Sequence, residues 1–218
     1  MVSKLAVSVA LLSSCVPSWA FSLVSRGRAL LPQRRTVRAG SPRSILNMKV
    51  GIVYSTQNGN TEACAEYISS ASGADAADVD SWSDEDLAQL SGIIVGAPTW
   101  NTGADDYRSG TGIDDFLYDR LPKLDMSGKS VAVFGLGDQE SYGDYYCDAM
   151  EEVWTCLKGK GAKMLGAWST DGYEFSESKS VKDGKFVGLA LDEDNQSDLS
   201  EGRCKKWVEQ LKSEGMPF

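Results

Sequence analysis

The protein has 218 residues, and 42% of them are hydrophobic, which is an ordinary proportion for a globular chain. It contains no histidine, which excludes a Ser-His-Asp triad, a histidine-ligated metal and an imidazole general base within this subunit. Its five cysteines include no C-x-x-C pair, so the usual spacing of zinc or iron–sulfur ligands is also missing. We interpret the four cysteines after residue 47 as small buried thiols, with disulfide pairing as the alternative.

Residues 1–47 have the composition of a targeting segment rather than of a folded domain. They carry seven basic residues and no acidic residue, and they open with an apolar run over residues 5–16. The run ends in Ser18-Trp19-Ala20, the small-residue pattern of a signal-peptidase site, so we expect a signal peptide over residues 1–20. The arginine- and serine-rich residues 21–47 are typical of a transit peptide.

Two targeting signals in series resemble the bipartite presequence of algae whose plastid lies inside extra membranes. The resemblance implies import into the plastid stroma and a mature domain over residues 48–218; the alternative is a secreted protein with a basic propeptide. Without residues 1–47 the chain keeps 15 basic against 31 acidic residues, a formal charge of −16. Such a domain repels nucleic acid and anionic membranes and attracts basic partner surfaces, unless the charge serves solubility alone.

The first elements of the mature domain are a buried strand from about Val50 to Tyr54 and a helix that begins near Thr61. The loop between them is rich in hydroxyl and amide side chains, and the helix start offers free N–H groups and a positive dipole end. It lacks the lysine of a nucleoside-triphosphate loop and the three glycines of a dinucleotide loop, so it suits a single phosphate monoester. The alternative is a plain turn in which Asn58-Gly59 supplies positive φ and Thr61 caps the helix.

The rest of the chain alternates between strands and helices. The predicted elements are a weak strand over 74–79, a short helix opened by Ser83, a strand over 90–96, a helix over 113–121, a strand over 129–136, an amphipathic helix over about 149–157, a strand from 162 and a helix over 199–211. This alternation predicts an α/β fold, a parallel sheet between two helical layers. Polar, glycine-containing loops follow three strands, and in such sheets they meet at one ligand site.

The pattern breaks over residues 168–189, which are polar, dotted with aromatic residues and without a period. We interpret this segment as an insertion that splits the fifth strand. A long loop of this kind is often functional, although covering a sheet edge would explain it equally well.

The three loops, in this order, resemble those of the flavodoxin family. The matching stretches are Thr56-Gln57-Asn58-Gly59-Asn60-Thr61, Pro98-Thr99-Trp100-Asn101-Thr102-Gly103 and Gly137-Asp138-Gln139-x-x-Tyr142, and residues 168–173 and 184–196 resemble the extra segment of long-chain members. The resemblance covers residues 49 to about 213. It implies a flavodoxin-like three-layer sandwich with a five-stranded parallel sheet of order 2-1-3-4-5, for which flavodoxin is the standard example, and a long-chain insertion over 171–190 in the fifth strand.

The resemblance also implies non-covalently bound FMN. The first loop would hold its phosphate, Trp100 and Tyr142 would stack on the two faces of the flavin ring, and Asp194 would bind the ribityl chain. Acidic groups such as Asp138 would make the flavin harder to reduce. The complete implied set is Thr56, Gln57, Asn58, Gly59, Asn60, Thr61, Pro98, Thr99, Trp100, Asn101, Thr102, Gly103, Leu136, Gly137, Asp138, Tyr142, Tyr145 and Asp194. Asn58, Tyr145 and Cys147 depart from the common family pattern.

The resulting hypothesis is a low-potential one-electron carrier rather than an enzyme. It would be monomeric and would replace ferredoxin between photosystem I and ferredoxin–NADP reductase, docking through its acidic surface, with no nucleic acid and no stable membrane association. Two alternatives are consistent with the same residues. One is an FMN-dependent NAD(P)H:quinone oxidoreductase, and the other is a regulatory module without flavin.

Overall fold

The computed structural model describes residues 50–100 and 104–218. The predicted signal and transit peptides and the start of the mature domain lie outside the described residues, and so do Asn101, Thr102 and Gly103 of the second loop. Those predictions stay predictions.

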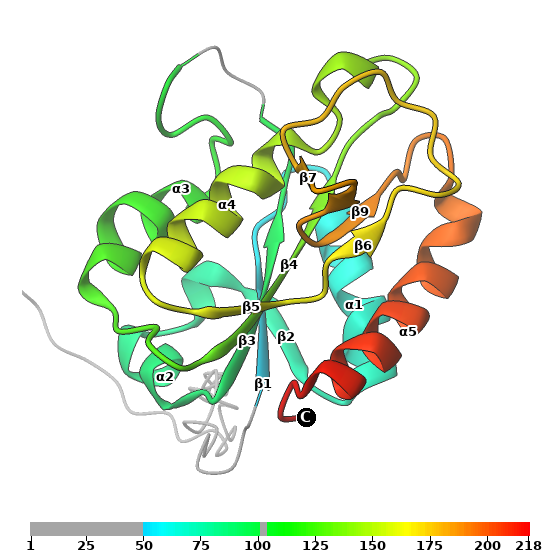
Figure 1. Cartoon of the computed structure of the whole chain (residues 1–218). Coiled ribbons are helices and arrows are strands. Elements are labelled where there is room, and N and C mark those ends of the chain that lie inside the picture. The colour runs from blue at the N-terminus through cyan, green and yellow to red at the C-terminus, as the bar shows by residue number, and fades with distance from the viewer. Residues whose placement is uncertain (1–49, 101–103) are drawn as a thin grey trace, which may run out of the picture. The chain divides into compact units, whose positions relative to one another are not determined.

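A parallel sheet forms the centre of the domain (Figure 1). Its strands are β1 (Val50–Tyr54), β2 (Asp75–Asp78), β3 (Gly92–Ala97), β4 (Ser130–Leu136), β5 (Lys163–Leu165) and β9 (Leu189–Leu191). Their order is β2-β1-β3-β4-β5, and β9 also pairs with β4. β5 lies beside Ser130–Ala132, whereas β9 lies beside Phe134–Leu136. The two short strands therefore share the fifth position, which confirms the predicted order and the split strand.

Helices cover both faces of the sheet, as Figure 1 shows. α1 (Asn60–Ser72) and α5 (Ser197–Glu214) lie on one face, and α2 (Asp84–Gln89), α3 (Gly112–Asp115) and α4 (Asp148–Gly159) lie on the other. Successive strand residues alternate between the two layers: Ile52 and Ile94 pack with α1 and α5, while Val53 and Val95 belong to the opposite core. All four are fully buried, because both faces are covered.

The helix predicted over 113–121 is irregular in the structure. α3 continues into a π-helical turn, η2 (Phe116–Arg120), and then a 3-10 turn, η3 (Leu121–Lys123). Pro122 accounts for the ending, because it has no N–H to donate to an α-helical acceptor. The short helix predicted after Ser83 is confirmed as α2: Ser83 accepts the N–H of Asp86, whose carboxylate accepts the N–H of Ser83.

The insertion has more structure than the sequence indicated. Between β5 and β9 it forms a small antiparallel sheet of β6 (Trp168–Ser169), β8 (Lys185–Phe186) and β7 (Val181–Lys182). β7 and β8 are joined by Asp183-Gly184, both with positive φ (54° and 76°), which is the backbone of a type I′ hairpin turn. The sequence predicted no strands within the insertion, because two-residue strands are too short to show a period. A further turn, η1 (Val79–Ser81), follows β2, and η4 (Gly143–Tyr145) precedes α4.

Within the described part of the chain, no helix has both the length and the apolar character needed to cross a bilayer.

Candidate functional site

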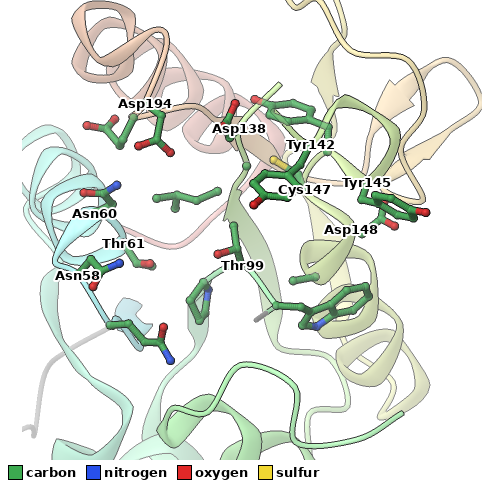
Figure 2. Close-up of a pocket in the computed structure, with 18 of the residues that line it drawn as sticks. Asn58, Asn60, Thr61, Thr99, Asp138, Tyr142, Tyr145, Cys147, Asp148 and Asp194 are labelled. Carbon is green, nitrogen blue, oxygen red and sulfur yellow. The ribbon is translucent and has the colours of Figure 1, made fainter. Parts of the chain in front are cut away.

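A pocket of about 690 Å³ opens where β1, β3 and β4 end. Figure 2 shows its polar residues Asn58, Asn60 and Thr61 on one side and the rings of Tyr142 and Tyr145 on the other. The described residues that line it are Thr56, Gln57, Asn58, Asn60, Thr61, Pro98, Thr99, Trp100, Leu136, Gly137, Asp138, Tyr142, Tyr145, Tyr146, Cys147, Asp148, Ala149, Glu193 and Asp194. None of these is a lysine or an arginine.

The loop after β1 leaves the start of α1 open to the pocket. Gly59 is the residue before the helix, with φ of 89°, and none of the described side chains caps the first turn. The hydroxyl of Thr56 instead accepts the N–H of Gly59 (2.9 Å), which closes the loop on itself. Asn60 and Thr61 follow as the first helical residues and line the pocket. The first N–H groups of α1, at the positive end of its dipole, therefore lie beside the pocket with no side-chain partner among residues 50–100 and 104–218, which is an arrangement that binds anions.

The alternative interpretation of the loop, a plain turn capped by Thr61, agrees with the structure only in part. Positive φ at Gly59 is confirmed, but Thr61 is not the helix cap, because it lies inside the first turn and is buried. A plain capped turn would have satisfied the free N–H groups, and this one does not.

The loop after β3 brings Trp100 to the pocket. Its indole ring is half-buried, and the guanidinium of Arg108 lies over the ring, 3.5 Å from the centroid. Arg108 is also ion-paired with Glu152 on α4, and the ammonium of Lys179, from the insertion, lies 5.5 Å from the same centroid. Arg108, from the segment that follows Trp100, and Lys179, from the insertion, thus stabilise the indole through cation–π contacts.

The loop after β4 contributes a carboxylate that accepts several hydrogen bonds. Asp138 accepts the backbone N–H groups of Ser141 (2.8 Å) and Glu140 (3.0 Å) and the amide of Asn195 (2.9 Å). These bonds, the one from Ser141 above all, lower the pKa of Asp138. The carboxylate is therefore charged at neutral pH and faces the pocket.

A buried carboxylate joins this loop to the segment after β9. Asp192 is fully buried and accepts the N–H groups of Gln139 (3.0 Å), Asp194 (3.1 Å) and Asn195 (2.9 Å). Asp192 in this way positions Asp194, which lines the pocket together with Asp138; Figure 2 labels both. With Asp148 and Glu193, four carboxyl side chains line a pocket that has no basic lining residue among the described ones. Desolvation by burial raises the pKa of Asp148.

Fourteen of the residues predicted from the sequence line the pocket. Gly59 belongs to the first loop but is not part of the wall, and Asn101, Thr102 and Gly103 lie outside the described residues. The sequence prediction missed five lining residues. Four of them, Tyr146, Cys147, Asp148 and Ala149, form the entry to α4, directly after the predicted Tyr145; the fifth, Glu193, precedes Asp194. Proximity in sequence was the available signal.

Comparison with known proteins identifies the family. The family model described as flavodoxin matches residues 52–207, which is more than half of the chain. The chain belongs to the flavodoxin family. A flavodoxin from Synechocystis is 46% identical over 170 residues, covering 75% of this chain and 96% of its own, and one from Nostoc is 45% identical over 174 residues, covering 78% and 98%. A flavodoxin is an electron carrier rather than an enzyme, and that class comes with the family.

Solved structures agree with this assignment. The crystal structure of a Fusobacterium nucleatum flavodoxin bound to flavin mononucleotide superimposes with a TM-score of 0.66 at 29% identity, covering 76% of this chain and 97% of that one. The flavodoxin-like fold expected from the loops is thereby confirmed. Within residues 50–100 and 104–218, no cluster of acidic and cysteine side chains could hold a metal ion.

Proposed function

We propose that this flavodoxin binds FMN in the pocket and carries single electrons with it. The observation that carries the proposal is that one pocket of suitable size combines an anion-binding loop of uncharged donors with aromatic side chains. The uncapped first turn of α1 fits a terminal phosphate, with Thr56, Asn58 and Thr61 as further donors. The Fusobacterium relative, whose structure contains flavin mononucleotide, supports the choice of ligand.

The opposite side of the pocket fits a planar aromatic ring. Trp100 and Tyr142 line it, and Tyr142 is 68% exposed, so its face is available for stacking. Bound FMN supplies the one-electron chemistry, and the chain determines how easily that chemistry occurs. The carboxylates of Asp138 and Asp194 disfavour added negative charge on a nearby ring, which makes the carrier a strong reductant once loaded.

We further propose that the protein works in a plastid stroma and replaces ferredoxin between photosystem I and ferredoxin–NADP reductase. The acid-free, arginine-rich residues 1–47 support the plastid location. The charge of −16 over residues 48–218 supports docking to basic surfaces of redox proteins. Native protein from the source cell gives the test: an N-terminus near Met48 is expected, whereas a final form that begins at Phe21 would rule out the plastid assignment.

One experiment separates electron carriage from the two alternatives. The purified protein is titrated with FMN and then photoreduced without oxygen while its absorption spectrum is recorded. We expect a flavin spectrum and reduction in two separable one-electron steps, with no direct reduction by NADPH. Rapid two-electron reduction by NADPH would indicate a quinone oxidoreductase, and failure to bind FMN would indicate a flavin-free module.

A further inference from the structure

We infer that the insertion fixes the ring side of the pocket. Residues 173–181, here called the strap, hold residues 142–148, here called the wall loop, in the conformation that accepts the flavin ring. Ser178 and Ser180 are the positioning residues: their side chains contact the wall loop rather than the ligand. This inference rests on the proposed FMN site and gives the insertion a role there.

The strap follows the wall loop through a series of hydrogen bonds. At one end, the carbonyl of Gly143 accepts the backbone N–H groups of Ser176 and Glu177, both at 3.0 Å. At the other end, the backbone N–H of Lys179 donates to the buried carboxylate of Asp148 (2.7 Å). These bonds fix both ends of the wall loop against one continuous segment.

Two serine hydroxyls complete the series in the middle. Ser178 donates to the carbonyl of Tyr146 (2.5 Å), and Ser180 donates to the carbonyl of Cys147 (2.6 Å). Ser180 is fully buried, so its hydroxyl acts away from water. Tyr146 and Cys147 both line the pocket, and the two serines therefore hold the backbone of the pocket wall itself.

Aromatic packing adds to the hydrogen bonds. The Tyr146 ring is 1% exposed and stacks on Phe175 of the strap with 5.5 Å between centroids and 25° between planes. It also meets Tyr173 and Phe186 of the insertion, at 6.0 Å and 5.9 Å. The insertion thus supplies the aromatic rings that pack against Tyr146, the residue before Cys147.

The wall loop needs such support because its backbone is strained. Cys147 has φ of 54°, in the left-handed region that non-glycine residues avoid. Strained residues persist only where their surroundings hold them. The Cys147 carbonyl accepts the Ser180 hydroxyl and the N–H of Met150 (3.1 Å), while its thiol faces the carbonyls of Gly135 and Leu191. Without the strap a relaxed loop gains population, and the apparent affinity for the ring falls in proportion to the competent fraction.

Covering a sheet edge does not explain these contacts. Among the described residues, one side-chain hydrogen bond joins the strap to the strand β9, from the Tyr173 hydroxyl to the Ala190 carbonyl (2.6 Å), whereas five bonds from residues 176–180 go to residues 143–148. The strap is therefore aligned with the wall loop rather than with β9, the strand at the edge of the parallel sheet.

The test compares the Ser178→Ala/Ser180→Ala variant with the wild type in the full mature protein. Affinities for FMN and for riboflavin, which lacks the phosphate, are measured by quenching of flavin fluorescence. We expect both affinities to fall about tenfold, with their ratio unchanged, because the lost bonds act at the ring end. The visible circular dichroism of the bound flavin should shift as well, since it reports on the surroundings of the ring.

Two control variants show whether an effect is specific to the contacts between the strap and the wall loop. Ser169→Ala removes a hydroxyl that contacts Asp171 inside the insertion, and should leave both affinities within twofold. Thr61→Ala acts at the phosphate end and should lower the affinity for FMN more than that for riboflavin. Urea midpoints of the flavin-free forms are recorded for every variant, because a merely structural role would lower them without changing the ligand affinity of the folded protein.

Each outcome decides between the two proposals. If the wild type binds neither flavin, the proposed function is wrong. If the wild type binds FMN and the double serine variant binds both flavins within twofold of it, with an unchanged dichroism spectrum, the role of the strap is overturned and the proposed function stands. Should the double variant not fold, Ser180→Ala alone and Phe175→Leu, which keeps an apolar side chain, are judged by the same criteria.

Discussion

Asp138 keeps its charge because three donors surround its carboxylate. Two are backbone N–H groups of its own loop, and the third is Asn195, which comes from the segment after β9. A local turn and a distant side chain together stabilise the ionised form. The same negative charge lines the pocket in which the flavin ring is proposed to accept an electron. The turn that keeps Asp138 ionised therefore opposes reduction of the ring.

Replacing this charge should make bound FMN easier to reduce. In Asp138→Asn an amide oxygen still accepts the two backbone bonds, so the loop is kept while the charge is lost. We expect the potential of the more negative one-electron step to rise by about 50 mV, the effect of one charge several ångströms away at an intermediate effective dielectric constant. Potentiometric titration measures this, and Asp171→Asn, in the insertion, is the matched control. Equal potentials in Asp138→Asn and wild type would show that the carboxylate does not act on the ring.

Asp148 shows the opposite environment at the same site. Its side chain is 4% exposed and desolvation raises its pKa, although the N–H of Lys179 partly opposes this. A raised native pKa means that the folded state binds the proton more tightly than the unfolded state does. The ionised carboxylate therefore costs stability above the native pKa, and the cost disappears below the unfolded pKa of about 3.9.

Asp148→Asn should accordingly stabilise the flavin-free protein at pH 8 and not at pH 4. The amide oxygen can still accept the N–H of Lys179, so the gain comes from removing a buried charge and should be about 1 kcal/mol or less. Urea unfolding of both proteins across this pH range provides the measurement. A difference that is largest in acid would contradict the assignment of the cost to the ionised form.

The hairpin of the insertion shows how a short turn organises an element that has little regular structure of its own. β7 and β8 contribute two residues each, and the turn between them requires positive φ at both Asp183 and Gly184. Asp-Gly is among the pairs that adopt this conformation most easily. The hairpin places Phe186, which is fully buried, beside the Tyr146 ring, so the turn also contributes to the wall loop.

The same substitution at two glycines should have opposite effects. A Cβ at Gly184 would meet no atom within 4 Å, but φ of 76° strains any L-residue there, so Gly184→Ala should destabilise by about 1 kcal/mol. Gly202 lies inside α5 and is equally open, so Gly202→Ala should stabilise by about 0.5–1 kcal/mol through helix propensity. Chemical denaturation of both variants checks the signs. A stabilising Gly184→Ala would mean that the turn is not type I′ in solution.

The sequence predicted the parts of this molecule that depend on local pattern. Buried strands such as β3 read as continuous apolar runs, and their alternation with helices gave the parallel sheet. The strand order came from the resemblance in the loops, because hydrophobic pattern alone does not order strands. The role of the strap could not be predicted from the sequence. Its serines bind backbone carbonyls about 32 residues away in sequence, and such contacts produce no periodic pattern of residue types. In the sequence Cys147 departs from the common family pattern, but its positive φ follows from the packing of the wall loop.

At the scale of the whole molecule, charge should govern how fast this flavodoxin meets its partner. The charge of −16 over residues 48–218 should attract the basic reductase proposed as partner over a Debye length, which is about 10 Å at 0.1 M salt, so the rate of electron transfer between them should fall as salt rises. Steering depends on charge near the site. Glu140 lies just before the wall loop and Asp144 within it, and both are exposed, so Glu140→Gln/Asp144→Asn should flatten the salt dependence more than Glu209→Gln on α5. Stopped-flow rates with ferredoxin–NADP reductase across a salt series measure both effects. A rate independent of salt in the wild type would remove electrostatic steering from the docking, while leaving the FMN site untouched.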